Sequence, residues 1–265
     1  MGGTLMLRLI YLLRRKPELT REAFQQYWRD QHGPLVASFA TTLGIQRYVQ
    51  VHSLDDPAND AMAHARGGME APYDGVAELW WDSEAALERA MTDPAAQGAG
   101  AALLEDESHF IDFANSPLWL AIDLPQVNPP GPEPIATPRS SWIKLMFPLR
   151  LQQSLGFEEG QRYWRTQHGP IIRSHAAAAG IARYQQVHRV IHPLEAALRE
   201  SRGTVVDAYD GHAEVWLDRG YLPHSLEASA SSQRAIEDES QFIDFKRSAM
   251  WFGKELVFID RREWN

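Results

Sequence analysis

The chain has 265 residues, a formal net charge of −9, 44% apolar residues and no cysteine. The lack of cysteine excludes disulfides, thiolate nucleophiles and Cys-ligated metal sites. The acidic balance argues against nucleic acid or an anionic membrane as partner, because both need clustered Lys and Arg. No stretch approaches the ~18 apolar residues of a membrane span, and no signal region is expected, so we predict a cytoplasmic enzyme or binding protein.

The first half of the chain predicts six elements in the order β-α-β-β-α-β, which is the ferredoxin-like order. Residues 6–13 form an apolar run typical of a strand, and Thr20 is a suitable N-cap for the helix that follows. Gly33-Pro34 is expected to end or kink this helix, because the residue before a proline disfavours the α conformation. The remaining predictions are a resumed helix over 35–43, strands over 45–53, 73–81 and 117–124, a polar loop over 54–72 and a mostly helical segment over 84–110.

The second half of the chain repeats the first. The octapeptide Tyr-Trp-Arg-Asp-Gln-His-Gly-Pro at 27–34 returns at 163–170 with one difference, and sixteen of twenty-six positions of 27–52 are identical in the second copy. Two further blocks, at 73–80 and 105–113, return in the same order at 209–216 and 237–245. Two copies indicate a duplicated module and not a solenoid.

A proline-rich stretch separates the copies. Because prolines fix φ and remove donors, we expect an extended connector there. The predicted domains are 1–124 and 142–265, with a linker over 125–141. Each ferredoxin-like sheet needs cover on one face, so the two units are predicted to form an α+β fold, an intrachain dimeric α+β barrel. Further pairing of this pseudo-dimer into a homodimer stays open.

The repeated motifs resemble those of the EthD family, in the dimeric α+β barrel superfamily. They are the Phe-x-x-Tyr-Trp-x-x-x-His-Gly-Pro helix, the Gly-Ile-x-Arg-Tyr entry to strand two and the Tyr-Asp-Gly-x-Ala-Glu-x-Trp strand, and they cover both halves. The resemblance places the family's motif histidine at His32 and His168. Some fungal relatives look like dehydratases or decarboxylases of polyketide intermediates, and superfamily members include cofactor-free monooxygenases, isomerases, cyclases and haem proteins. The second copy departs from the pattern at Gly160, where the first has Phe24.

His32 and His168 are the predicted general acid/base residues. Each is expected at a helix C-terminus, where the helix dipole favours the imidazolium form while burial favours the neutral ring, and this balance suits proton transfer near neutral pH. Phe24, Trp28 and His32 are spaced i, i+4, i+8, so the histidine shares an apolar helix face. The alternative is a histidine that only caps its helix by binding a terminal carbonyl.

Aromatic residues beside these histidines are predicted to assist them. Tyr27 and Tyr163 are expected to donate a phenolic hydrogen bond to a substrate oxygen. Trp28 and Trp164 are expected to line an apolar substrate pocket or the core.

The two copies are not interchangeable. His175 occurs only in the second copy, about two helical turns after His168, and is a candidate substrate-binding residue. His212 is a second extra histidine, so the second half is predicted to be the more active. The long loops at 54–72 and 190–208 also differ, and loops of this length are often lids or binding elements.

His52 and His188 end the second strand at matching positions. Tyr48, Gln50 and His52 alternate onto one strand face. Two interpretations are open: a strand end that faces solvent, or the wall of a substrate pocket below the long loop.

Asp74 and Glu78, with their counterparts Asp210 and Glu214, are acidic residues on the third strand. A strand carboxylate usually faces water or pairs with an arginine, such as Arg47. The alternative is that these carboxylates orient the motif histidines and contact substrate.

The sequence predicts no cofactor and no metal site, because it has no glycine-rich phosphate loop ahead of a helix and no His-Glu-x-x-His motif. The leading hypothesis is a cofactor-independent lyase, a dehydratase or decarboxylase, that acts on an aromatic or polyketide-like small molecule by histidine acid/base catalysis. The alternatives are a cofactor-free monooxygenase or isomerase of similar substrates, and a small-molecule binding protein without catalysis.

Overall fold

The computed structural model describes residues 6–223 and 225–262, so the outermost residues of both predicted domains, 1–5 and 263–265, lie outside the described part of the chain. The elements of the first unit are β1 (Leu7–Leu13), α1 (Arg21–Tyr27), η1 (Trp28–His32), α2 (Gly33–Ser38), β2 (Arg47–Ser53), α3 (Pro57–Ala65), β3 (Gly75–Trp81), α4 (Glu84–Thr92), α5 (Pro94–Glu107), η2 (Phe113–Asn115) and β4 (Leu118–Val127). Those of the second unit are β5 (Trp142–Leu149), α6 (Phe157–Tyr163), η3 (Trp164–His168), α7 (Gly169–His175), β6 (Ile181–Arg189), α8 (Pro193–Glu200), β7 (Gly211–Asp218), η4 (Arg219–Tyr221), α9 (Leu226–Glu239), η5 (Phe245–Arg247) and β8 (Trp251–Asp260).

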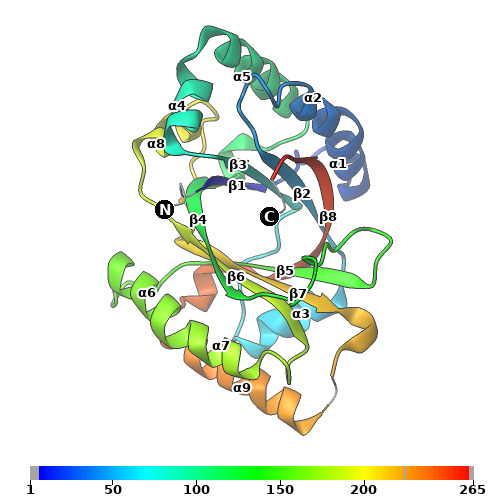
Figure 1. Cartoon of the computed structure of the whole chain (residues 1–265), viewed down its shortest axis with the longest axis vertical. Coiled ribbons are helices and arrows are strands. Elements are labelled where there is room, and N and C mark those ends of the chain that lie inside the picture. Colours follow the sequence, from blue (N-terminus) through cyan, green and yellow to red (C-terminus); the bar gives the residue numbers. More distant parts are fainter. Residues whose placement is uncertain (1–5, 224, 263–265) are drawn as a thin grey trace.

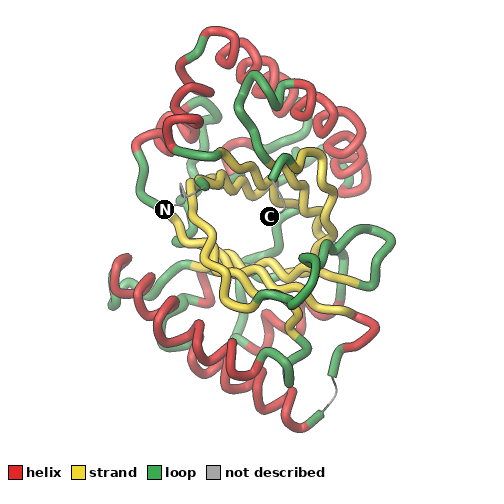
Figure 2. Tube along the Cα trace, in the orientation of Figure 1, coloured by secondary structure: helices red, strands yellow, loops and turns green. Residues whose placement is uncertain are grey.

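The described strands close into one barrel in the order β1-β3-β2-β8-β5-β7-β6-β4, and neighbouring strands are antiparallel. Each unit contributes a ferredoxin-like sheet, and the units join edge to edge through the β2–β8 and β4–β6 pairs. The helices lie outside the barrel in two groups on opposite sides (Figures 1 and 2). Closure pairs both edges of every described strand. The predicted α+β fold, an intrachain dimeric α+β barrel, is therefore confirmed.

Successive side chains of each strand point alternately into the barrel and towards the helices. On β1, Ile10 and Leu12 pack inside the barrel with Trp119 and other buried residues. Leu9 and Leu13, on the same strand, pack outside against the helices of the first unit. The helix-facing side of each sheet is thus a second apolar surface, separate from the barrel interior.

The helix does not end at Gly33-Pro34, which was one of the two outcomes expected there. The helical path runs on from α1 into α2 through one π-helical turn, η1, in which the Gly33 N–H donates to the Trp28 carbonyl. Pro34 lacks an N–H and its ring would crowd the preceding turn of an α-helix, and the wider π-helical turn accommodates it. His32 therefore sits within a continuous helical path and not at a C-terminus, and η3 repeats this turn around His168.

The two long loops contain helices that cross to the opposite unit. α3, from the first unit, packs against β8, and α8, from the second unit, packs against β4. In Figure 1, α8 accordingly lies with the helices of the first unit and α3 with those of the second. The segments expected as polar loops are thus partly helical.

Candidate active sites

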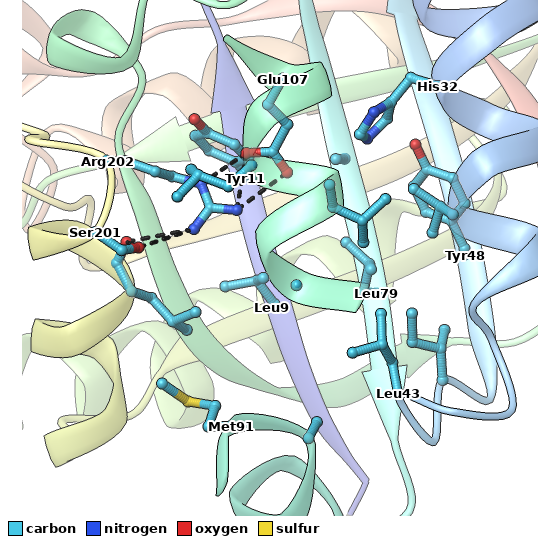
Figure 3. Close-up of a pocket in the computed structure, with 18 of the residues that line it drawn as sticks. Leu9, Tyr11, His32, Leu43, Tyr48, Leu79, Met91, Glu107, Ser201 and Arg202 are labelled. Carbon is cyan, nitrogen blue, oxygen red and sulfur yellow. Dashed lines mark hydrogen bonds and ion pairs between the residues drawn. The ribbon is translucent and has the colours of Figure 1, made fainter. Parts of the chain in front are cut away.

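Each unit has an apolar cavity between the outer face of its sheet and its helices. The first, of about 310 Å³, is lined by β1, β2 and β3, by the turn around His32, by α5 and by the end of α8 (Figure 3). The second, of about 420 Å³, has the matching position around His168, and His175 also lines it. Most of the lining is apolar, as in small-molecule sites generally.

His32 is held in one orientation by Asp106. Its Nδ1 lies 2.7 Å from Oδ2 of Asp106, and the Tyr27 hydroxyl donates to Oδ1 of the same carboxylate over 2.7 Å. The hydrogen bond from His32 lowers the pKa of Asp106, so the carboxylate is ionised and can only accept. Nδ1 therefore carries the proton. Nε2 remains as the basic nitrogen, and no protein partner for it is found among the described residues.

The second copy repeats this arrangement. Nδ1 of His168 lies 2.7 Å from Oδ2 of Asp238, and Tyr163 donates to Oδ1 over 2.9 Å. Burial favours a higher pKa for Asp238, but the hydrogen bonds from His168 and Tyr163 outweigh it and lower the pKa. Sequence reasoning missed both aspartates. The available signal was their identical place in the third repeated block.

Tyr27 and Tyr163 do not line the cavities, contrary to the role expected for them. Their hydroxyls bind the two aspartates, so they position the carboxylates and not a substrate. Burial, together with the hydrogen bond to the aspartate, raises the pKa of each tyrosine to about 12 and keeps it a neutral donor. Trp28 and Trp164 do line the cavities.

A chain of hydrogen bonds along β2 leads to the Tyr48 hydroxyl. Nε2 of His52 lies 2.8 Å from Oε1 of Gln50, which leaves the Gln50 amide nitrogen to donate to the Tyr48 oxygen over 2.9 Å. The Tyr48 oxygen already accepts, and no acceptor for its proton is found among the described residues. Tyr48 lines the first cavity on the same side as His32 (Figure 3), so its proton is available to a ligand oxygen.

His52 and His188 lie beneath the cavities, neither facing solvent nor lining a pocket. His52 stacks on Trp28 with ring centroids 4.6 Å apart, and His188 stacks on Trp164 at 4.3 Å. Burial lowers the pKa of each to about 3, so both rings are neutral. They orient the glutamine amides that bind Tyr48 and, in the second unit, Tyr184.

Asp74 and Asp210 lie away from the cavities, although we expected them to bind substrate. Asp74 directly precedes β3 and binds Arg15 and Arg21. Asp210 accepts the backbone N–H of Leu151 over 2.8 Å. Both carboxylates therefore secure backbone segments at the start of their third strands.

Glu78 and Glu214 point into the barrel, on the side of the sheet opposite the cavities. Nζ of Lys144 lies 2.8 Å from Glu78 and 3.0 Å from Glu214, and Arg8 also binds both carboxylates. With His212, the two glutamates offer three potential metal ligands whose atoms lie within 4.8 Å of one another. The two cations already neutralise these carboxylates and would repel a divalent ion, so the cluster does not fit a metal.

Each cavity is lined in part by an arginine from the opposite unit. Arg202, just after α8, binds Glu107 of α5, with Nε 2.8 Å from Oε2 and Nη2 3.0 Å from Oε1 (Figure 3). Arg66, just after α3, binds Glu239 of α9 in the same way at the second cavity, with Nε 2.8 Å from Oε2. The predicted lids thus belong to the cavity of the other unit, and neither cavity is complete without both halves of the chain.

The EthD domain matches residues 16–114 and 152–246 of this chain. An anthrone oxidase-like protein of solved structure is similar over 99% of this chain and 97% of its own, with 10% identity and a TM-score of 0.53. An ethyl tert-butyl ether D family protein from Bacillus halodurans is 21% identical over 44% of this chain and 96% of its own, with a TM-score of 0.31. A dimeric protein of ferredoxin-like fold from Bacteroides fragilis is 10% identical over 43% of this chain and 93% of its own, with a TM-score of 0.29.

No curated protein matches the sequence. Among the residues that the structure describes, no helix has the length and apolar character needed to cross a membrane.

Proposed function

This chain belongs to the EthD domain family, and we propose that its two cavities are active sites in which His32 and His168 act as general acid/base residues. The protein is proposed to be a cofactor-independent lyase, a dehydratase or decarboxylase, of an aromatic or polyketide-like small molecule. The observation that carries the proposal is a histidine on each cavity wall whose Nδ1 is fixed by an ionised aspartate and whose Nε2 has no protein partner among the described residues. An imidazole whose Nδ1 is fixed in this way presents Nε2 to a bound ligand as a proton acceptor.

A dehydration assigns one step to His32 and one to Tyr48 of the first cavity. Nε2 of His32 takes a proton from a carbon next to a substrate carbonyl. The Tyr48 hydroxyl donates to the carbonyl oxygen as that oxygen gains negative charge. The electrons of the broken C–H bond then form the alkene as the hydroxyl on the β-carbon leaves. This hydroxyl takes the proton from His32 and departs as water, so the histidine returns to its neutral form and nothing is oxidised.

The apolar lining supports a flat substrate rich in hydrocarbon. Leu9, Leu43 and Leu79 line the first cavity between its polar groups. Such a lining excludes water from the reacting atoms, which strengthens the hydrogen bond from Tyr48 to a developing oxyanion. The substrate therefore needs one carbonyl oxygen near His32 and an otherwise apolar body.

A test uses 3-hydroxy-1-tetralone, whose dehydration gives 1-naphthol and water and is followed by naphthol fluorescence. The wild-type protein is expected to accelerate naphthol release. The double variant His32→Gln/His168→Gln should lose at least 10²-fold in kcat, the size typical of a lost general base. His64→Gln is the control, because it removes an exposed histidine that lines neither cavity and leaves both Nε2 atoms in place. Equal rates for wild type and the His32→Gln/His168→Gln variant would reject the proposal.

An oxygenase is a second candidate, supported by the shared barrel fold with the anthrone oxidase-like protein. The same Nε2 could deprotonate an anthrone, whose carbanion reacts with O₂ to give an anthraquinone and water. Oxygen uptake with anthrone that requires His32 and His168, without turnover of the tetralone, would favour this reaction. Binding of both compounds without turnover of either would support the third alternative, a small-molecule binding protein without catalysis.

A further inference from the structure

The two cavities differ in volume, and one matched position on the crossing helices lines only the second of them. Ala58 on α3 lines the second cavity, and its counterpart on α8 is Leu194. Leu194 packs against the apolar cluster of the first unit. A leucine thus fills space in the first unit that an alanine leaves open in the second, where the cavity is about 420 Å³ against about 310 Å³.

Three further matched positions change in the same direction, whereas two lining positions, Val36 to Ile172 and Gly100 to Ser232, change in the opposite one. In each of the three, the residue beside the second cavity is smaller than its counterpart beside the first. The three exchanges are Leu43 to Ala179, Trp81 to Leu217 and Leu103 to Ala235. The larger volume is therefore built into several elements of the second cavity and does not depend on one rotamer.

α3 is fixed against the second unit, so Ala58 is a permanent part of the second cavity. Oδ1 of Asn59 accepts the backbone N–H of Phe252 over 2.9 Å. At the other end of α3, Arg66 forms its buried ion pair with Glu239. Both contacts join the first unit's helix to the second unit's barrel strand and helix.

We infer that the two cavities select flat aromatic ligands of different size, and that Ala58 of the first unit is a specificity-determining residue of the second cavity. The first cavity takes a two-ring compound, and the second also takes a three-ring compound. This inference rests on the proposed function, because it assigns substrate classes to the same cavities. The inference predicts that a substitution in the first half of the chain alters which ligands bind in the cavity of the second unit.

Methionine methyl groups allow each cavity to be observed separately in the full chain. Met91 lines the first cavity and Met250 lines the second. Titration of ¹³C-methyl-methionine protein with 2-naphthol and with 2-hydroxyfluorene, followed by NMR, gives an affinity for each probe at each cavity. In the wild type, 2-naphthol should shift both methyl signals, whereas 2-hydroxyfluorene should bind at least tenfold more tightly at Met250 than at Met91.

Two substitutions at the matched position test whether a residue of one unit sets ligand selection in the cavity of the other unit. Ala58→Leu should weaken 2-hydroxyfluorene at Met250 at least tenfold and leave both titrations at Met91 unchanged. Leu194→Ala, the reciprocal change, should admit 2-hydroxyfluorene at Met91. If Ala58→Leu lowers the unfolding midpoint, Ala58→Met is used instead, because it also enlarges the side chain at this position but is more flexible.

Three results would overturn the inference: equal affinity of 2-hydroxyfluorene at both cavities of the wild type, an effect of Ala58→Leu at Met91 instead of Met250, or no shift of either methyl with either probe. The readout is binding alone, so it is separate from the proposed function. Size selection without tetralone turnover would reject only the lyase. Turnover that needs His32 and His168, without size selection, would reject only this inference.

Discussion

Oδ2 of Asp106 lies 2.7 Å from Nδ1 of His32 and joins the end of α5 to the π-helical turn η1. The aspartate is ionised, so it fixes the proton on Nδ1 and turns the basic Nε2 towards the cavity. Asp238 and His168 have the same relationship in the second unit. The proposed chemistry depends on this pair.

Asp106→Asn with Asp238→Asn should lower tetralone turnover at least tenfold while the fold is retained. Asparagine offers one carbonyl oxygen where the carboxylate offers two, so it cannot accept from both the histidine and Tyr27, and the histidine loses its enforced tautomer. Stopped-flow naphthol fluorescence measures the effect. Glu105→Gln, an exposed neighbour on α5, is the matched loss of charge and should leave the rate unchanged. An Asn double variant as active as this control would exclude an orienting role for the aspartates.

Tyr48→Phe with Tyr184→Phe should reduce kcat about 10²-fold and change KM little, because the lost hydrogen bond strengthens mainly as the substrate oxygen gains charge. Tyr27→Phe with Tyr163→Phe should reduce kcat only a few-fold, since these hydroxyls act through the aspartates. Steady-state kinetics of the two double variants compares the roles. A larger loss of kcat in Tyr27→Phe/Tyr163→Phe than in Tyr48→Phe/Tyr184→Phe would contradict the roles assigned to the two pairs.

Arg202→Met should lower the free energy of unfolding by about 3 kcal/mol, because it leaves the buried Glu107 carboxylate without its partner. Adding Glu107→Leu should restore most of the loss, since both charges are then gone. A double-mutant cycle from urea unfolding measures the coupling. Additive losses would show that the pair does not hold the two units together.

Acid should destabilise the protein through its buried neutral histidines, which are His52, His188 and His212 among the described residues with a lowered pKa. Burial lowers the pKa of His52 and His188 in the folded state to about 3 and that of His212 to about 4. The unfolded histidine takes up a proton below about pH 6.5, so unfolding is favoured as pH falls through the window from about 6.5 down to the folded pKa, by about 1.4 kcal/mol per pH unit for each histidine. Their contribution is fully present above pH 6.5.

Urea unfolding at pH 7.5, 6 and 5 checks this dependence above the range where most carboxylates titrate. His52→Gln with His188→Gln should reduce the loss between pH 6.5 and 5. His64→Gln, which replaces an exposed histidine, should not. Identical slopes in all three proteins would contradict burial of neutral rings at 52 and 188.

The fold could be predicted from the sequence because each sequence motif occurs twice, in the same order, and both copies indicate the same element. The spacing of Phe24, Trp28 and His32 placed the histidine on an inward helix face, and the structure buries all three residues. The helix does not end at Pro34 as one expectation had it, because a π-helical turn accommodates the proline without ending the helical path. Rules that compare only an α-helix with its end do not include this turn.

The partners of the histidines depend on long-range geometry. Asp106 is 74 residues from His32, and their contact is set by how α5 crosses η1. In the same way, the crossing of α8 to the first unit follows from barrel closure, which no local pattern encodes. Glu78 was expected to contact substrate, but it points into the barrel. When both faces of a strand are buried, the alternation of its side chains does not tell which face meets a cavity.

The central claim is that Nε2 of His32 and His168 moves protons of a carbonyl compound bound in an apolar cavity. Exchange of the α-protons of 1-tetralone in D₂O, followed by ¹H NMR, tests this step without requiring the natural substrate. We predict exchange well above the uncatalysed rate with the wild type and with His64→Gln, and loss of the acceleration in His32→Gln/His168→Gln. Equal exchange rates with the wild type and with His32→Gln/His168→Gln would contradict the account.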